Sequence, residues 1–287
     1  MATMDNVRPS PIAGQWYSSD PRRLAAQVDQ YIQNARLPEI PGEVVAVMAP
    51  HAGHRYSGPV AGHAFATLKG MKPEVVAVIS PMHYPYSDPL LTTAHQAYAT
   101  PLGEIMVDQA SLDALDHLLK QEIGIGLIRI EHDPEHSLEI ELPFLQRTLG
   151  DPFYLLPVMV RDQSTYVAQR LGRALANVLK GRRSILVAST DLSHFYAQAT
   201  AHSLDGEMLR QVEAFDPAGV IRAEELGKGF ACGRGALASV MWAAKALGAT
   251  QARLLNYATS GDVTGDNAQV VGYGAAVFTR PAAKPNA

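Results

Sequence analysis

The sequence predicts an α/β domain with a largely parallel central sheet, and three observations support this. Short apolar runs of strand length recur along the chain, helix-like stretches lie between them, and the composition fits a compact globule. The 287 residues are 47% hydrophobic and 18% charged, against an average of about 25% charged residues in soluble domains. Strands that alternate with helices are typical of a parallel sheet covered by helices.

Six apolar runs are rich in branched residues and too short for helices, so buried strands are expected there. The runs are EVVAVMA (43–49), EVVAVIS (74–80), FYLLPVMV (153–160), SILVAST (184–190), ARLLNYA (252–258) and VVGYGAAVF (270–278). Helices are expected at 20–35, 108–121, 164–181 and 236–248. No low-complexity linker divides the chain. Residues 1–280 are therefore predicted to form one domain, followed by a flexible tail at 281–287.

Charge and cysteine content narrow the possible functions. The 24 basic residues are outnumbered by 28 acidic ones, with no basic run, so nucleic acid is not an expected partner. A single cysteine cannot form an internal disulfide, which suits a reducing compartment. No stretch resembles a signal peptide or approaches the roughly 18 apolar residues of a membrane span. The sequence thus predicts a cytoplasmic protein without a membrane partner.

Three of the expected strands lead into polar residues that can do chemistry. VVAVMAPH leads to His51, VVAVISPMH to His83, and SILVASTDLSH to Asp191 and His194. The carboxyl ends of parallel strands meet at one sheet edge, where α/β proteins bind their ligands. Taken singly, each histidine also fits a hydrogen-bonded loop residue. The pattern leaves both a metal or catalytic cluster and ordinary loop roles open.

Two further segments carry candidate residues. In EHDPEHSLEIELPFLQ (131–146), a helix would put His136 and Glu139 on one side, where they can support a site. Glu135 follows Asp-Pro, and we interpret it as an acid in the first turn of a capped helix. The only cysteine, Cys232, lies in the glycine-flanked turn of GKGFACGRGALASV (227–240). A lone cysteine is usually a small buried hydrophobe, and this turn is a poor place to bury one.

Seven motifs in order resemble the Memo family, whose bacterial and archaeal branch is called AmmeMemoRadiSam system protein B. They are AGQWY (13–17), APHAG, SPMH, EHSLEIELPF, STDLSH, CGRGAL and LNYATSGD. The resemblance covers nearly the whole chain, although Tyr84 replaces a histidine often found at that place. It implies a fold similar to the class III extradiol dioxygenases, which are non-haem iron enzymes. The expected architecture is a single-domain three-layer αβα sandwich with a mostly parallel or mixed central sheet.

The resemblance also implies a metal site. Its ligands would be His51, His83 and Cys232, and the expected metal is Fe(II). Cu and Zn are alternatives, because a thiolate ligand makes the site softer. His194 would act as the acid or base, and Asp191 would orient it. The remaining expected site residues are Trp16, Tyr56 and Arg234 for substrate contact, and His136 and Glu139 in support of the ligands.

Three functions follow as hypotheses. The first is a non-haem iron redox enzyme of the dioxygenase-like type, acting on an unknown small molecule. The second is a zinc hydrolase or lyase, since two histidines, a cysteine and a water form a known catalytic zinc set. The third is a metal-binding protein without catalysis that works with AmmeMemoRadiSam system protein A and radical SAM proteins. The metal found, and whether activity needs oxygen, would separate them.

Overall fold

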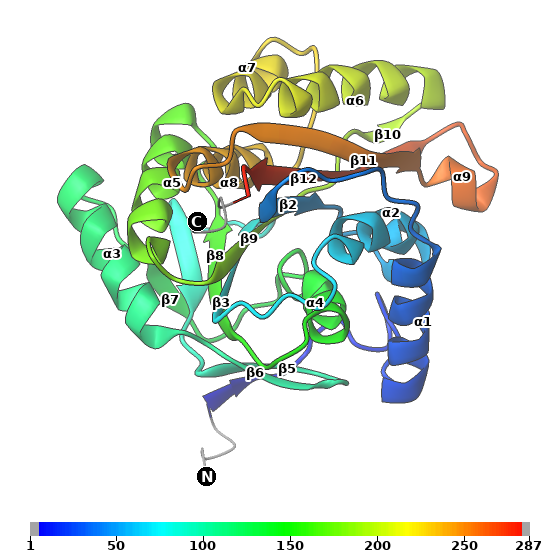
Figure 1. Cartoon of the computed structure of the whole chain (residues 1–287). Coiled ribbons are helices and arrows are strands. Elements are labelled where there is room, and N and C mark those ends of the chain that lie inside the picture. The colour runs from blue at the N-terminus through cyan, green and yellow to red at the C-terminus, as the bar shows by residue number, and fades with distance from the viewer. Residues whose placement is uncertain (1–5, 283–287) are drawn as a thin grey trace, which may run out of the picture.

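The computed structural model describes residues 6–282, and a nine-stranded mixed sheet forms its centre (Figure 1). The strands in order are β10 (His194–Tyr196), β12 (Val270–Arg280), β2 (Glu43–Ala49), β9 (Ser184–Ser189), β3 (Val75–Pro81), β8 (Tyr154–Val160), β4 (Leu90–Thr93) and β7 (Ile128–Ile130), with β11 (Gln251–Thr259) also paired to β12. The central strands β2, β9, β3 and β8 are parallel. β12 joins β2, and β4 joins β8, in antiparallel pairs.

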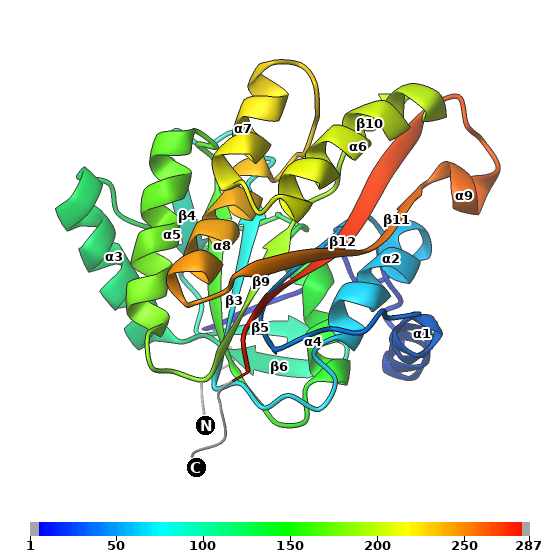
Figure 2. The same cartoon turned by 45° about the horizontal axis from the view of Figure 1, so that its top comes forward.

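Helices cover both faces of this sheet, which confirms the predicted αβα sandwich (Figure 2). One face carries α8 (Arg234–Ala246), α5 (Thr165–Leu179), α3 (Gln109–Ile123), α7 (Pro217–Glu225) and α6 (Gln198–Glu213). The other carries α2 (His54–Ala66), α1 (Pro21–Asn34) and α4 (Leu142–Thr148). A short α9 (Gly261–Thr264) follows β11. α8 packs across β3 and β9, and α2 packs on β2 and β12.

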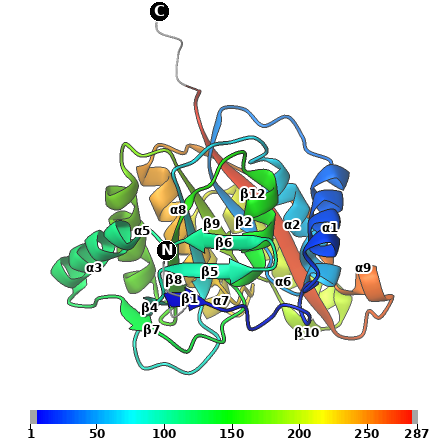
Figure 3. The same cartoon turned by 90° about the horizontal axis from the view of Figure 1, so that it is seen from below.

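A second, three-stranded sheet lies at the bottom of the view in Figure 1 and in front in Figure 3. It consists of β1 (Val7–Arg8), β5 (Ala97–Thr100) and β6 (Gly103–Met106). β1 pairs with β5 in parallel, and this pairing draws Arg8 into the interior, where it is 1% exposed.

The six predicted strands and four predicted helices are all observed, with ends shifted by a few residues. Helix starts follow capping chemistry, since Asp20, Asp108 and Ser164 each accept a hydrogen bond from the N–H three residues on. The sequence did not predict α2, because a proline and two glycines in its interior disfavour a helix. Gly62 serves packing here: a Cβ at this position would lie 2.5 Å from the backbone oxygen of Tyr31 in α1.

One large hydrophobic cluster extends from Ile12 to Phe278, and a small second one consists of Ala168, Ile221 and Ala238. The predicted tail at 281–287 falls outside the described residues from 283 on. Between residues 6 and 282, no helix has both the length and the apolar character needed to cross a membrane.

Candidate metal centre

Two of the predicted histidines meet because the strands that precede them are near neighbours. β9 pairs in parallel with both β2 and β3, so the residues that follow the three strands emerge at one sheet edge. His51 lies two residues after β2, His83 two residues after β3, and Asp191 two residues after β9. The structure brings His51 and His83 together as expected.

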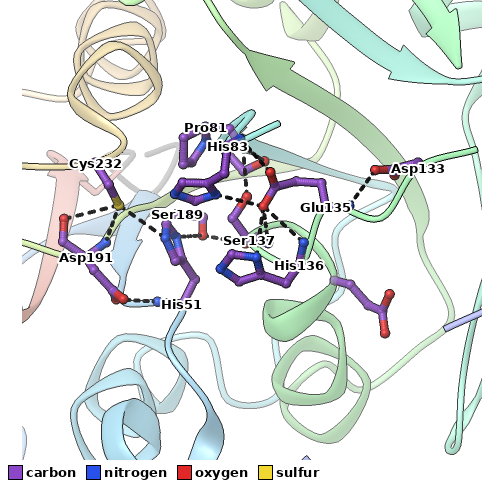
Figure 4. A network of polar contacts seen from close by, with 12 residues as sticks. His51, Pro81, His83, Asp133, Glu135, His136, Ser137, Ser189, Asp191 and Cys232 are labelled. Carbon is purple, nitrogen blue, oxygen red and sulfur yellow. Dashed lines mark hydrogen bonds and ion pairs between the residues drawn. The ribbon is translucent and has the colours of Figure 1, made fainter. Parts of the chain in front are cut away.

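A third histidine completes the cluster. One nitrogen from each of His51, His83 and His136 lies within 4.8 Å of the others. The ring of His136 stacks on that of His83 at a centroid distance of 4.9 Å, and it lies 5.5 Å from the ring of His51. Figure 4 shows the three imidazoles between Cys232 on one side and Glu135 on the other. His136, expected only to support the ligands, is therefore itself a candidate ligand.

The Glu135 carboxylate orients two of these imidazoles. Its Oε1 accepts a hydrogen bond from His83 Nδ1 at 2.9 Å and lies 3.2 Å from His136 Nδ1. The backbone N–H of His83 donates to Oε2, and those of His136 and Ser137 donate to Oε1. Burial tends to raise the pKa of Glu135, but the hydrogen bonds and charge of His83 outweigh it and lower the pKa to about 2. An ionised carboxylate that holds the second nitrogen of a histidine is typical of metal sites.

The interpretation of Glu135 as an acid in the first turn of a helix is wrong. The 3₁₀-helix η2 (Glu139–Glu141) begins only at Glu139, and α4 follows it. Glu135 lies in the loop before η2 and is 1% exposed. The sequence signal was genuine, since acid and proline do begin helices, but a distant contact overrides it.

That contact comes from Arg8, which no motif marked. Its Nε donates to Asp133 Oδ2 at 2.7 Å, and its Nη2 donates to the backbone oxygens of Asp133 and Glu135 at 3.1 and 2.7 Å. Its Nη1 pairs with Glu139, which also accepts a hydrogen bond from Tyr17. Arg8 thus holds the loop that carries Glu135, and Glu139 belongs to this network rather than to the imidazole cluster.

Two of the imidazoles, those of His51 and His136, have the lowered pKa that favours the neutral form a metal binds. His51 Nδ1 lies 2.9 Å from Ser189 Oγ, so all three rings have Nδ1 next to an oxygen. Burial, together with the neighbouring histidines, lowers the pKa of His51 well below its usual value. Burial also lowers the pKa of His136 to about 4. Neutral imidazoles with an oriented second nitrogen fit zinc, copper or iron.

Cys232 approaches the cluster from the side of His51. Its Sγ lies 3.2 Å from His51 Nε2 and accepts a hydrogen bond from the Asp191 backbone N–H at 3.3 Å. It stands outside the group of three nitrogens. Gly233 permits this approach, because a Cβ there would lie 2.6 Å from the backbone oxygen of Ser189. Burial and the Asp191 charge raise the pKa of the thiol, so a bound metal is what would favour the thiolate.

Asp191 and His194 border the same cluster. Asp191 Oδ1 accepts the backbone N–H of His51 at 2.7 Å, and burial raises the pKa of Asp191 to about 7. His194 lies in β10 with its ring 5.5 Å from that of Phe230. Its buried Nδ1 has no hydrogen-bond partner in the described part of the chain. Burial lowers the pKa of His194, so its imidazole is neutral at pH 7 and can accept a proton.

The three expected substrate contacts differ in their surroundings. The Trp16 ring lies on that of His136 at 4.0 Å. Tyr56 lies in the first turn of α2 and is 38% exposed. Arg234 opens α8, but its guanidinium pairs with Glu224, so an anionic ligand would have to compete with that carboxylate.

Changing Glu135 to glutamine is expected to weaken metal binding about 10–100-fold, the usual cost of losing an orienting partner of a ligand. The backbone N–H groups of His83, His136 and Ser137 and the His83 Nδ1–H all point at this carboxylate. The NH₂ group of a glutamine would therefore face at least one of these donors. Metal affinity is measured by competition with a chelator. Glu131→Gln changes an exposed acid of the same loop and serves as the control. Equal affinities of the two variants would contradict the role given to Glu135.

Comparison with known proteins shows the family of this chain. The family described as Memo-like protein matches residues 8–277. A MEMO1 family protein of Nitrosopumilus maritimus is 35% identical over 276 residues, covering 95% of this chain and 99% of that protein. One from Methanopyrus kandleri is 36% identical over 284 residues, covering 95% of this chain and 99% of its own. The match spans the strands and loops that carry every residue of the imidazole cluster, and the chain belongs to the Memo family.

Proposed function

We propose that this protein is a metal-dependent redox enzyme whose metal is held by His51, His83 and His136, with Cys232 as a further donor. The observation that carries the proposal is the convergence of the three imidazoles, whose ring nitrogens lie within 4.8 Å of one another while each Nδ1 lies next to an oxygen. Structural histidines rarely converge in this way, whereas metal ligands need it.

Fe(II) is the metal we propose, with Cu and Zn as alternatives, because imidazole suits all three and a thiolate adds softness. Bound by these donors, iron supplies one-electron redox chemistry and open coordination positions for a substrate. As a thiolate, Cys232 would supply a negative charge that imidazole ligands lack.

The surrounding residues then have separate tasks. His194 offers the unbonded Nδ1 and takes up a proton from the substrate. The Asp191 carboxylate anchors the backbone of His51 and so fixes the loop after β2. Trp16 shields one face of His136 from water. Trp16 and Tyr56 are assigned to substrate contact, and Arg234 to an anionic substrate group that displaces Glu224.

A zinc hydrolase or lyase is the second candidate. It is favoured by the three converging imidazoles, since three histidines are also the ligands of zinc enzymes that acidify a bound water. The role as a metal-binding partner of AmmeMemoRadiSam system protein A and radical SAM proteins rests on the family resemblance alone.

Elemental analysis of anaerobically purified protein, beside Cys232→Ser, tests the proposal. We expect stoichiometric iron in the wild type, a sharp loss of iron in the variant with an unchanged circular dichroism spectrum, and oxygen uptake that depends on the iron. Stoichiometric zinc with hydrolysis that needs no oxygen would favour the second candidate. A serine variant that keeps its full metal content would remove Cys232 from the ligands, and a wild type without metal would overturn both candidates.

A further inference from the structure

The Ser189 hydroxyl is buried and makes three polar contacts. These contacts can all be hydrogen bonds only if one more group nearby is protonated. Its Oγ lies 2.9 Å from His51 Nδ1, 2.6 Å from the backbone oxygen of Ser137 and 2.8 Å from Glu141 Oε1. Ser189 and Glu141 are fully buried. A hydroxyl carries one hydrogen and two lone pairs, so these three contacts must be shared among one donated and two accepted hydrogen bonds.

The backbone oxygen of Ser137 can only accept, so it takes the hydrogen of Ser189. Ser189 Oγ must then accept the other two hydrogens, one from His51 and one from Glu141. His51 supplies its hydrogen from Nδ1, which leaves the lone pair on Nε2. Glu141 can supply one only from a protonated carboxyl group. Any other distribution leaves two oxygens in contact at 2.6 or 2.8 Å with no hydrogen between them.

The second oxygen of Glu141 agrees with this count. Oε2 is buried and has no hydrogen-bond partner within residues 6–282. A bare oxygen of an ionised carboxylate is far more costly to bury than the carbonyl oxygen of a neutral acid. Burial and the nearby Asp191 carboxyl also raise the pKa of Glu141 well above its usual value.

We propose that Glu141 is a neutral carboxylic acid in the folded protein and a positioning residue for His51, which it holds through Ser189 with the hydrogen on Nδ1 and the lone pair on Nε2. The protonation of Glu141 is a property of the folded chain itself. Its consequence for metal binding rests on the proposed function, since it concerns the nitrogen that would face the metal.

Infrared spectroscopy of the metal-free wild type, with isotope-labelled glutamate carboxyl groups, tests the protonation directly. Spectra are recorded at alkaline pH, where Asp191, with a pKa of about 7, is ionised. We expect a band of a protonated carboxyl group that disappears in Glu141→Gln and stays in Asp191→Asn. A wild type without this band, or a band that survives in Glu141→Gln, would overturn the proposal. Because the wild type alone gives the first answer, a variant that fails to fold does not block the test.

The positioning role has its own readouts. NMR of isotope-labelled histidine should show His51 with its hydrogen on Nδ1 in the wild type and in Glu141→Gln, whose amide still donates to Ser189. Glu141→Met removes the donor and should lower metal affinity about 10-fold or more, with a mixture of His51 tautomers, while Glu141→Gln stays within a few-fold of the wild type. Equal affinity and the same tautomer in Glu141→Met would refute the positioning role. If the wild type binds no metal, the infrared result still stands and only the proposed function fails.

Discussion

Changing His136 to alanine is expected to remove most of the bound metal, with a loss of affinity of more than about 100-fold. Residues that only orient a ligand already cost about 10–100-fold when they are changed, and His136 offers a nitrogen within 4.8 Å of those of His51 and His83. The fold should persist, because His136 lies in a loop rather than in the sheet. Chelator competition and elemental analysis measure the loss, and thermal unfolding of the metal-free variant checks the fold.

The matched control is His117→Ala. His117 is an exposed histidine of α3 whose Nε2 lies 2.9 Å from the Gln121 amide, so its loss should leave the affinity unchanged. Should His136→Ala bind metal as tightly as the wild type, the ligands would be His51, His83 and Cys232, as the family resemblance implies.

Changing Arg8 to methionine is expected to lower the free energy of unfolding by about 3–5 kcal/mol, the usual cost of breaking a buried ion pair by removing one partner. The side chains of Arg8, Asp133 and Glu139 are at most 2% exposed. Without the guanidinium, two carboxylates and two backbone oxygens would lose their partner in the interior. Urea unfolding followed by circular dichroism measures the change.

A surface arginine provides the comparison. Arg147 makes two hydrogen bonds to Asp29, of 2.8 and 2.6 Å, but both side chains are partly exposed. Arg147→Met should therefore cost at most about 1 kcal/mol. Similar losses in the two variants would mean that the buried network around Arg8 does not stabilise the fold as argued.

The sequence alone predicted those strands and helices whose residue pattern is local. The branched runs that became β2, β3, β8 and β9 are buried on both faces, so their composition is itself the signal. The positions of His51 and His83 followed from the same rule, because residues after parallel strands emerge at one edge. Short strands such as β4 to β7 were missed, since three or four residues carry no period that can be recognised.

What could not be predicted depends on contacts between distant segments. The loop that holds Glu135 and His136 looks like a helix start, and contacts from distant residues, those of Arg8 and His83 among them, hold it as a loop. The approach of Cys232 to His51 required the turn at Gly233 to pack against β9. The proposed protonation of Glu141 depends on three partners of one hydroxyl, all of them remote from Ser189 in sequence, and no spacing pattern encodes that count.

The wide separation of these contacts along the chain bears on how the site forms. Arg8 and Asp133 are 125 residues apart, His51 and Asp191 140, and His51 and Cys232 181. Contacts between residues so far apart in sequence form late in folding. Closing the large loops between them costs chain entropy before the contacts stabilise the chain. During synthesis the first 231 residues must emerge before the thiol exists at all. An ion bound at the proposed site would join segments from across the chain and would slow their separation.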